Sequence, residues 1–312
     1  MVRMEMPVTV DPDPSRSRVA SPARRAVLRG LAVAPLAALT VRKANAQARS
    51  SRPVQDDADF VVATLGPRRP AEFDTERARR AFERELARPV RMQHFTSGAR
   101  LADAASAGNL HCAVHTSLTF AATALACRCA LPVLRPISLD GAAGVRAVVL
   151  VRQDSGFARI GDLAGRVALG AKRGTVAGEV ARSALSARFG PAAAPFHDDA
   201  GDPIARFDAG EGDALVGFER IDAKGQALDG TTAFLKADVR VVWRSFPVWH
   251  GPVALSASGT VTRVMGEKAV AALATMRPGG PELRGMGLGR VRNLTAASFD
   301  EYAPLLRVVR GS

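Results

Sequence analysis

The stretch from residue 60 to residue 126 alternates three times between a short apolar run and an amphipathic run. The apolar runs predict strands at 60–64, 90–95 and 110–114, and the other runs predict helices at 74–86, 99–107 and 117–126. In the first helix, Ala78, Ala81, Phe82 and Leu86 follow the spacing of one helical face, and Asp74 is the expected N-cap. Because this alternation places strands side by side with helices across their faces, the sequence predicts an α/β fold with a parallel sheet.

The chain beyond residue 144 continues with strands and helices in a less regular order. The sequence predicts strands at 145–152, 166–170, 214–218 and 241–244, and helices at 179–189, 203–209 and 260–278. Asp202 followed by Pro203 is a helix-start signal, and Gly210 is the expected stop. A proline-flanked segment at 247–252 is expected to cross between two parts of the fold.

The carboxyl ends of the first three strands are the expected location of a binding site. His115, Thr116 and Ser117 lie where the third strand leads into a helix, and a helix N-terminus is a suitable place for an anion. Plain helix capping by Thr116 and Ser117 has equal weight as an explanation. Arg68 and Arg69 lie in the first strand–helix loop, where a solvated surface role is the stronger interpretation.

Residues 1–46 have the features of a twin-arginine export signal. Arg24 and Arg25 precede an apolar run at 31–41, and an Ala-Asn-Ala step ends at Ala46. The apolar run has about half of the roughly 20 residues that a membrane-spanning helix needs, which argues against an anchor. The sequence therefore predicts a periplasmic protein that begins near Gln47, is exported already folded and has no stable membrane insertion after cleavage.

The charge of the chain is positive but does not indicate nucleic-acid binding. Removing the eight basic and three acidic residues of 1–46 from the total of +13 leaves a net charge of +8. Arginines are scattered among alanines and acidic residues, and the chain has one Tyr and two Trp for base stacking. We expect no nucleic-acid partner, while a net positive charge helps to attract anions.

Three cysteines allow one disulfide and leave one thiol, and the sequence does not identify the pair. His111, Cys112 and His115 suggest a metal cluster, but residues four apart on a strand lie about 13 Å apart, which is too far for one ion. The second hypothesis, an exported metal-dependent or redox enzyme, depends on these residues together with Cys127 and Cys129. We expect no cofactor and no enzymatic activity.

Several segments of the chain, taken in order, carry a resemblance to a known family. They are Arg152–Gly156 with Asp162–Arg166, Gly174–Gly178, Gly210–Ala214, Trp243–Pro247 and Asp300–Leu305. In this order and spacing they resemble the phosphate/phosphite/phosphonate-type (PhnD-like) periplasmic substrate-binding proteins of ABC importers, and the similarity runs from about residue 58 to about residue 308.

This resemblance implies a type II periplasmic-binding-protein-like fold: two α/β lobes joined by two crossing strands, with a ligand cleft between them. Lobe one is expected at 47–147 and 252–312, and lobe two at 148–251. The implied function is capture of a small anion, a phosphonate- or phosphate-like oxyanion, for an ABC permease by a monomeric protein.

The resemblance also implies which residues bind the ligand. The family's hydroxyl-rich anion loop matches Gly174, Thr175, Val176, Ala177 and Gly178. Two cleft tyrosines of the family match Gly98 and Phe120, and its lobe-two aspartate matches Glu219. His115, Thr116 and Ser117 are further candidates, and so is His250 beside Trp249 at the second crossing, although an ordinary surface or core role is the stronger interpretation for His250.

The chain departs from the family pattern at several of these positions. In the anion loop one hydroxyl, that of Thr175, is kept and two are replaced by Val176 and Ala177. Gly98 and Phe120 lack the phenolic hydroxyl. These changes favour an alternative within the same fold, in which the chain binds a less polar organic ligand or delivers its ligand to a sensor protein.

Overall fold

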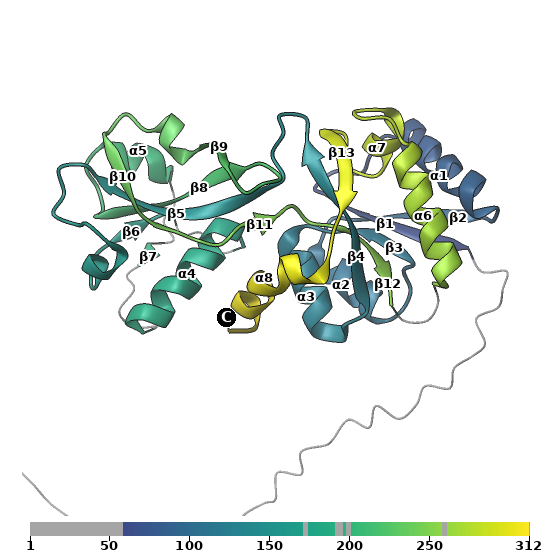
Figure 1. The fold of residues 1–312 in the computed structure, drawn as a ribbon, viewed down its shortest axis with the longest axis horizontal. Coiled ribbons are helices and arrows are strands. Elements are labelled where there is room, and N and C mark those ends of the chain that lie inside the picture. Colours follow the sequence, from purple (N-terminus) through teal and green to yellow (C-terminus); the bar gives the residue numbers. More distant parts are fainter. Residues whose placement is uncertain (1–58, 171–173, 191–195, 198–200, 258–260, 312) are drawn as a thin grey trace, which may run out of the picture. The chain divides into compact units, whose positions relative to one another are not determined.

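The computed structural model describes residues 59–170, 174–190, 196–197, 201–257 and 261–311. The predicted signal at 1–46 lies outside these ranges, as does 171–173 before the predicted anion loop. The described part is a mixed α/β structure with two sheets, which confirms the predicted fold class (Figure 1). No helix in the described ranges has the length and apolar character needed to cross a bilayer.

The first sheet has six strands in the order β13-β4-β12-β3-β1-β2. Strand β1 pairs in parallel with β2 and β3, as the strand–helix alternation predicts, whereas β12 and β13 join in antiparallel pairs. The strands are β1 (Phe60–Leu65), β2 (Val90–Phe95), β3 (Cys112–Val114), β4 (Ala130–Ser138), β12 (Val253–Ser256) and β13 (Val291–Ala296).

Helices from both ends of the chain cover this first sheet. Segments far apart in the sequence lie side by side here: α1 packs against α6 and α7, and α3 packs against α2 and α8 (Figure 1). The helices are α1 (Glu72–Leu86), α2 (Gly98–Ser106), α3 (Ser117–Cys127), α6 (Arg263–Thr275), α7 (Pro281–Gly285) and α8 (Phe299–Gly311).

The second sheet is built from the middle of the chain, in the order β10-β5-β8-β6-β7, with β11 on β5 and β9 on β8. Its strands are β5 (Gly144–Arg152), β6 (Ala168–Leu169), β7 (Phe196–His197), β8 (Ala214–Ile221), β9 (Ala227–Gly230), β10 (Val239–Arg244) and β11 (Val248–Trp249). Its helices are α4 (Val176–Phe189), α5 (Pro203–Asp208) and the 3-10 turns η1 (Ile160–Leu163) and η2 (Thr231–Phe234).

The chain passes between the sheets twice. It leaves the first sheet after β4 and enters the second at β5, and it returns from β11 to β12. All of β5 pairs within the second sheet from Gly144 onward, so this strand begins four residues before the predicted lobe boundary at 148.

The core of the first sheet confirms the predicted helical face but corrects the helix start. Ala78, Ala81, Phe82 and Leu86 are all buried in α1. The helix begins at Glu72 after Ala71, so the prediction of Asp74 as N-cap is wrong. Asp74 instead accepts from the Arg284 guanidinium at 3.0 Å, because α1 packs directly on α7.

Several strands, including β4, β12 and β13 of the first sheet, are absent from the sequence-based prediction. Strand β4 contains Pro132 and Pro136, and proline normally argues against a strand inside a sheet. The ladder shifts register between Val253 and Ala254 opposite β4, and shifts again between Val291 and Asn293 of β13. These irregularities accommodate positions without an N–H donor.

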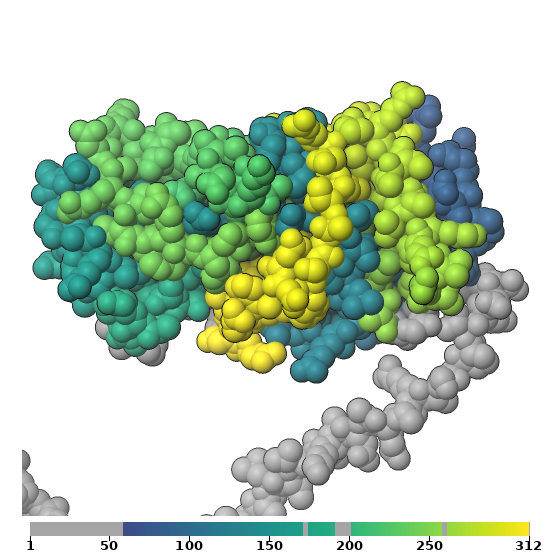
Figure 2. Space-filling model, in the orientation of Figure 1, coloured from purple at the N-terminus to yellow at the C-terminus, as the bar shows by residue number. Residues whose placement is uncertain are grey.

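A second cluster of apolar side chains involves helices from both parts of the chain. It contains Phe120 of α3, Val180 of α4, Val248 of β11 and Tyr302 of α8. Helix α8 therefore contacts α3 and α4 alike. In Figure 2 the yellow C-terminal segment lies on the molecular surface in this region.

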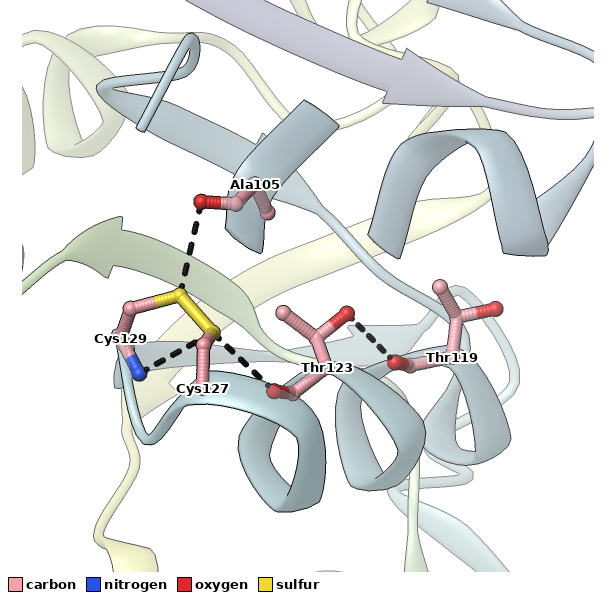
Figure 3. The surroundings of a disulfide bond; sticks show 5 residues. All are labelled: Ala105, Thr119, Thr123, Cys127 and Cys129. Atoms are coloured by element: carbon pink, nitrogen blue, oxygen red, sulfur yellow. Dashed lines mark hydrogen bonds between the residues drawn. A yellow bond between two sulfur atoms is a disulfide. The ribbon is translucent and has the colours of Figure 1, made fainter. Parts of the chain in front are cut away.

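The structure identifies the disulfide that the sequence left open. Cys127 and Cys129 are joined at the end of α3, and Cys112 is a buried free thiol (Figure 3). Arg128 between them adopts a left-handed conformation, with φ of 51°, where α3 ends. Burial raises the pKa of the Cys112 thiol to about 12, so this group stays protonated.

Reduction of this disulfide is expected to lower the free energy of unfolding by no more than about 1.6 kcal/mol, because it closes a loop of only three residues. Denaturant unfolding with and without dithiothreitol measures this difference. The Cys112→Ala variant is the control, since it removes the thiol that could exchange in the unfolded state. Complete unfolding on reduction under native conditions would contradict the expectation.

Candidate functional site

The N-terminus of α3 brings two of the predicted loops together. Thr116 is the N-cap, and its Oγ1 accepts from the Thr119 N–H at 3.1 Å and donates to the Thr119 hydroxyl at 2.9 Å. Gly98, at the start of α2, lies so close that an added Cβ would be 2.6 Å from Thr119 Oγ1. The structure therefore places Gly98 beside the exposed Thr116, at the carboxyl ends of β2 and β3.

The second crossing segment, residues 247–252, leads from β11 to β12 and lies directly against this helix N-terminus. Ser117 donates from its hydroxyl to the Trp249 carbonyl at 2.6 Å. At Gly251 an added Cβ would come within 2.0 Å of the His115 carbonyl oxygen, so only glycine fits there. The Ser117 hydroxyl thus holds the crossing segment in this structure, and Thr116 is the exposed hydroxyl of the pair.

His115 and Phe120 are core residues in this structure. His115 is 5% exposed, and its Nδ1 has no hydrogen-bond partner among the described residues. Burial lowers the pKa of His115 to about 4, so the ring is neutral at pH 7 and offers no positive charge to an anion. Phe120 is fully buried, with its ring centroid 4.9 Å from that of Tyr302. Neither side chain presents a surface on which a ligand can bind.

His250 is tied into the crossing by its backbone and its ring. The His250 carbonyl accepts from the Tyr302 hydroxyl at 2.8 Å, and the His250 N–H donates to the Ala143 carbonyl. Its Nδ1 lies 3.2 Å from the Pro136 carbonyl. Burial lowers the pKa of His250 as well. These contacts make His250 part of the junction between β4, α8 and the crossing segment.

The predicted anion loop is a helix cap and the first turn of α4. The sequence predicts a helix from Glu179, but α4 begins at Val176, with Thr175 as its N-cap accepting from the Gly178 N–H at 3.1 Å. Glu179 accepts from the Gly174 N–H at 2.7 Å. The Val176 and Ala177 side chains pack against the second apolar cluster. Donors left for an anion are therefore backbone N–H groups of the first turn, at the positive end of the helix.

Glu219, the expected acidic ligand, is already paired. It is 8% exposed, and both of its carboxylate oxygens accept from Arg244 Nε, at 3.0 and 3.1 Å. Arg146 Nη1 lies 3.8 Å from the same carboxylate. Neither arginine was expected as a partner of Glu219, because neither is close to it in the sequence. Strand pairing joins them: Arg146 is the register partner of Glu219 in the β5–β8 pair.

A buried arginine at the crossing was also missed. Arg135 of β4 is 6% exposed, and its guanidinium lies 4.2 Å from the centre of a Trp249 ring. It donates to Glu301 Oε1 at 2.7 Å, while its Nε has no partner among the described residues. The sequence did not indicate this role, because Arg135 is a charged residue in a segment whose two prolines argue against a strand.

The residues of the metal-enzyme hypothesis do not form a cluster in the described ranges, where no group of three or more His, Cys, Asp and Glu could hold a metal ion. His111 Nδ1 accepts from the Val61 N–H at 3.0 Å. Cys127 and Cys129 are bonded to each other. His111, Cys112 and His115 line one small cavity, but they do not form a group that could hold a metal ion in the described ranges.

Lowering the pH from 6.5 towards 4 is expected to destabilise the protein, because the unfolded chain binds a proton on His115 that the folded state excludes. The lowered pKa corresponds to a loss of up to about 3 kcal/mol in the free energy of unfolding, and this loss is nearly complete at pH 4. Unfolding free energies of wild type and His115→Gln measured across this range isolate the contribution. His111 and His250 also have lowered pKa values, so the unfolding free energy of the variant is still expected to fall with pH, but less steeply than that of wild type. An unchanged pH dependence in the variant would contradict the assignment to His115.

Comparison with known structures finds matches at low sequence identity. XAC2383 from Xanthomonas citri bound to ATP matches with a TM-score of 0.57 at 13% identity, covering 81% of this chain and 97% of that one. PhnD1 from Prochlorococcus marinus in complex with methylphosphonate matches with a TM-score of 0.47 at 10% identity, again covering 81% and 97%. At 13% identity the likeness to XAC2383 concerns the fold alone.

Comparison of sequences gives the family. No curated protein sequence matches the chain. Residues 74–299 match the family described as ABC transporter, phosphonate, periplasmic substrate-binding protein. This range includes most of both sheets and both crossings. The chain therefore belongs to the phosphonate periplasmic substrate-binding protein family of ABC transporters.

Proposed function

We propose that this protein captures a small oxyanion at the N-termini of α3 and α4 and delivers it to an ABC permease, without performing a reaction. Membership of the family implies a solute and a permease partner. The proposed ligand contacts are the Thr116 hydroxyl beside Gly98, and the Thr175 cap with the first-turn N–H groups of α4.

One observation carries this proposal. The first turns of α3 and α4 border the same apolar cluster: Phe120 is a member of it, and Val176 and Ala177 pack against it. Two helix N-termini therefore lie at one cluster, although α3 belongs with the first sheet and α4 with the second. Each N-terminus carries about half a positive charge, so the pair favours an anion even though His115 is neutral.

The side chains around these N-termini favour an organic anion over inorganic phosphate. Val176 and Ala177 supply methyl groups where the family pattern has hydroxyls. At Gly98, where the pattern has a tyrosine, an added Cβ would lie 2.6 Å from Thr119 Oγ1, so no phenolic hydroxyl is available at this position. An oxyanion with an attached apolar group would contact the Val176 and Ala177 methyl groups, and one structure of similar fold is bound to ATP.

We further propose that the protein works in the periplasm as a monomer, after export by the twin-arginine route. The paired arginines and the Ala-Asn-Ala step support the route. The division into lobes at 47–147 with 252–312, and at 148–251, remains part of the proposal.

Thermal unfolding of the full chain in the presence of phosphate, methylphosphonate, sulfate, ATP and small organic acids tests the proposal. A ligand at 100 times its Kd adds about 2.7 kcal/mol to the stability of the folded state. We expect one class of oxyanion to produce this shift. If none of these anions changes the melting temperature, capture of an oxyanion is wrong.

Replacing Thr175 by alanine is expected to weaken binding of that anion roughly 10-fold to 100-fold, measured by calorimetric titration, because a hydrogen bond to a charged group is lost. Thr262→Ala is the matched control. Thr262 caps α6 in the same way, accepting from the Met265 N–H at 3.2 Å, and lies outside the proposed site. Equal weakening in both variants would show a general effect of cap removal.

A further inference from the structure

A separate cavity of about 580 Å³ lies at the carboxyl ends of β1 and β2, next to the first turn of α1. Its volume is within the range of small-molecule sites. Its lining contains no residue of the proposed oxyanion site. The lining residues are Thr64, Arg69, Pro70, Glu72, Phe73, Thr75, Glu76, Met92, Gln93 and His94.

The strand side of this cavity contains buried polar groups. Thr64 is 3% exposed, and its hydroxyl lies 3.0 Å from His94 Nδ1. His94 Nε2 is buried and has no hydrogen-bond partner among the described residues. Met92 packs against the core from the same strand. Buried polar atoms without partners are rare in folded proteins, and they concentrate where a ligand or water completes them.

The helix side of the cavity offers donors for an anionic group. Helix α1 begins after Ala71, which supplies no side-chain cap, whereas α2, α3, α4 and α6 each have a Ser or Thr cap. The cavity adjoins this uncapped first turn, and Arg69 is one of the residues that line it. No ion pair of Arg69 is present in the described ranges. A carboxylate fits this combination of a guanidinium with free helix N–H groups.

The same cavity also offers an acceptor for a cationic group. Glu72 lines it and has no ion-pair partner in the part of the chain that the structure describes, whereas Glu76 is held by Arg79 at 2.6 Å and by Arg80 at 2.8 Å. The Glu72 carboxylate makes the lining unfavourable for a ligand that is purely anionic. Phe73, whose side chain is 63% exposed, adds an aromatic surface beside it.

We propose that this cavity binds a small zwitterion of the α-amino-acid class. Its carboxylate pairs with Arg69 and the first turn of α1, and its ammonium pairs with Glu72. The ligand's side chain contacts Phe73 and Met92, within reach of the Gln93 amide and His94. This cavity and the proposed oxyanion site share no residue, so binding at one does not require binding at the other.

Calorimetric titration of the full chain with L-phenylalanine and L-glutamine tests the proposal. We expect at least one of them to bind with a stoichiometry of one site. Analogues of the bound amino acid that lack either the carboxylate or the ammonium are expected to bind at least about 10-fold more weakly, because one ion pair is lost. Absence of binding by both amino acids at millimolar concentration would overturn the proposal.

Arg69→Gln and Glu72→Gln are each expected to weaken amino-acid binding at least about 10-fold. Arg68→Gln is the matched control, because Arg68 is the exposed neighbour of Arg69 and does not line the cavity. If Arg68→Gln weakens binding as much as Arg69→Gln does, general surface charge explains the result and the site is wrong. Thr175→Ala separates the two proposals, since it is expected to change oxyanion binding and leave amino-acid binding intact.

Discussion

The contact between the second crossing segment and the start of α3 is the constraint on which the rest of the structure depends. Gly251 lies so close to the backbone of residues 115 and 116 that no side chain fits, and Ser117 and Tyr302 bind the carbonyls of Trp249 and His250. These contacts set where the chain leaves the second sheet and re-enters the first. They also bring α3, α8 and β11 to one apolar cluster, which α4 joins. The location of two helix N-termini at this cluster follows from a crossing that is held by backbone contacts.

Local patterns in the sequence predict much of this fold, because helices and parallel strands repeat at fixed intervals. The buried face of α1 and the parallel pairing of β1 with β2 and β3 are of this kind. Strand β4 was missed because its two prolines contradict the usual strand pattern, and its place depends on β12 and β13, which are distant in sequence. Asp74 was expected to cap α1, but its carboxylate instead accepts a hydrogen bond from Arg284, which lies 210 residues away in the sequence.

The candidate site shows the same division between local and distant information. The cap role of Thr116 is local, and the sequence indicates it, whereas Thr175 was expected in a loop and caps a helix that begins three residues earlier than predicted. The burial of His115, the pairing of Glu219 with Arg244 and the stacking of Arg135 on Trp249 are tertiary, and no spacing predicts them. Family patterns mark positions in a chain, but exposure and pairing determine which side chains are available to a ligand. Here they favour backbone donors and threonine hydroxyls over histidine and phenylalanine.

The position of β12 has a consequence for how the molecule is made. This strand lies between β3 and β4, yet it follows them by more than 100 residues in the chain. While the protein is being synthesised, β3 and β4 are neighbours with a missing strand, and each has an unpaired edge. The first sheet closes only after all strands of the second sheet have been made, so it cannot complete its folding before them. Until these last strands have been synthesised, the open edges of β3 and β4 have to be protected from pairing with other chains, which is a task of chaperones.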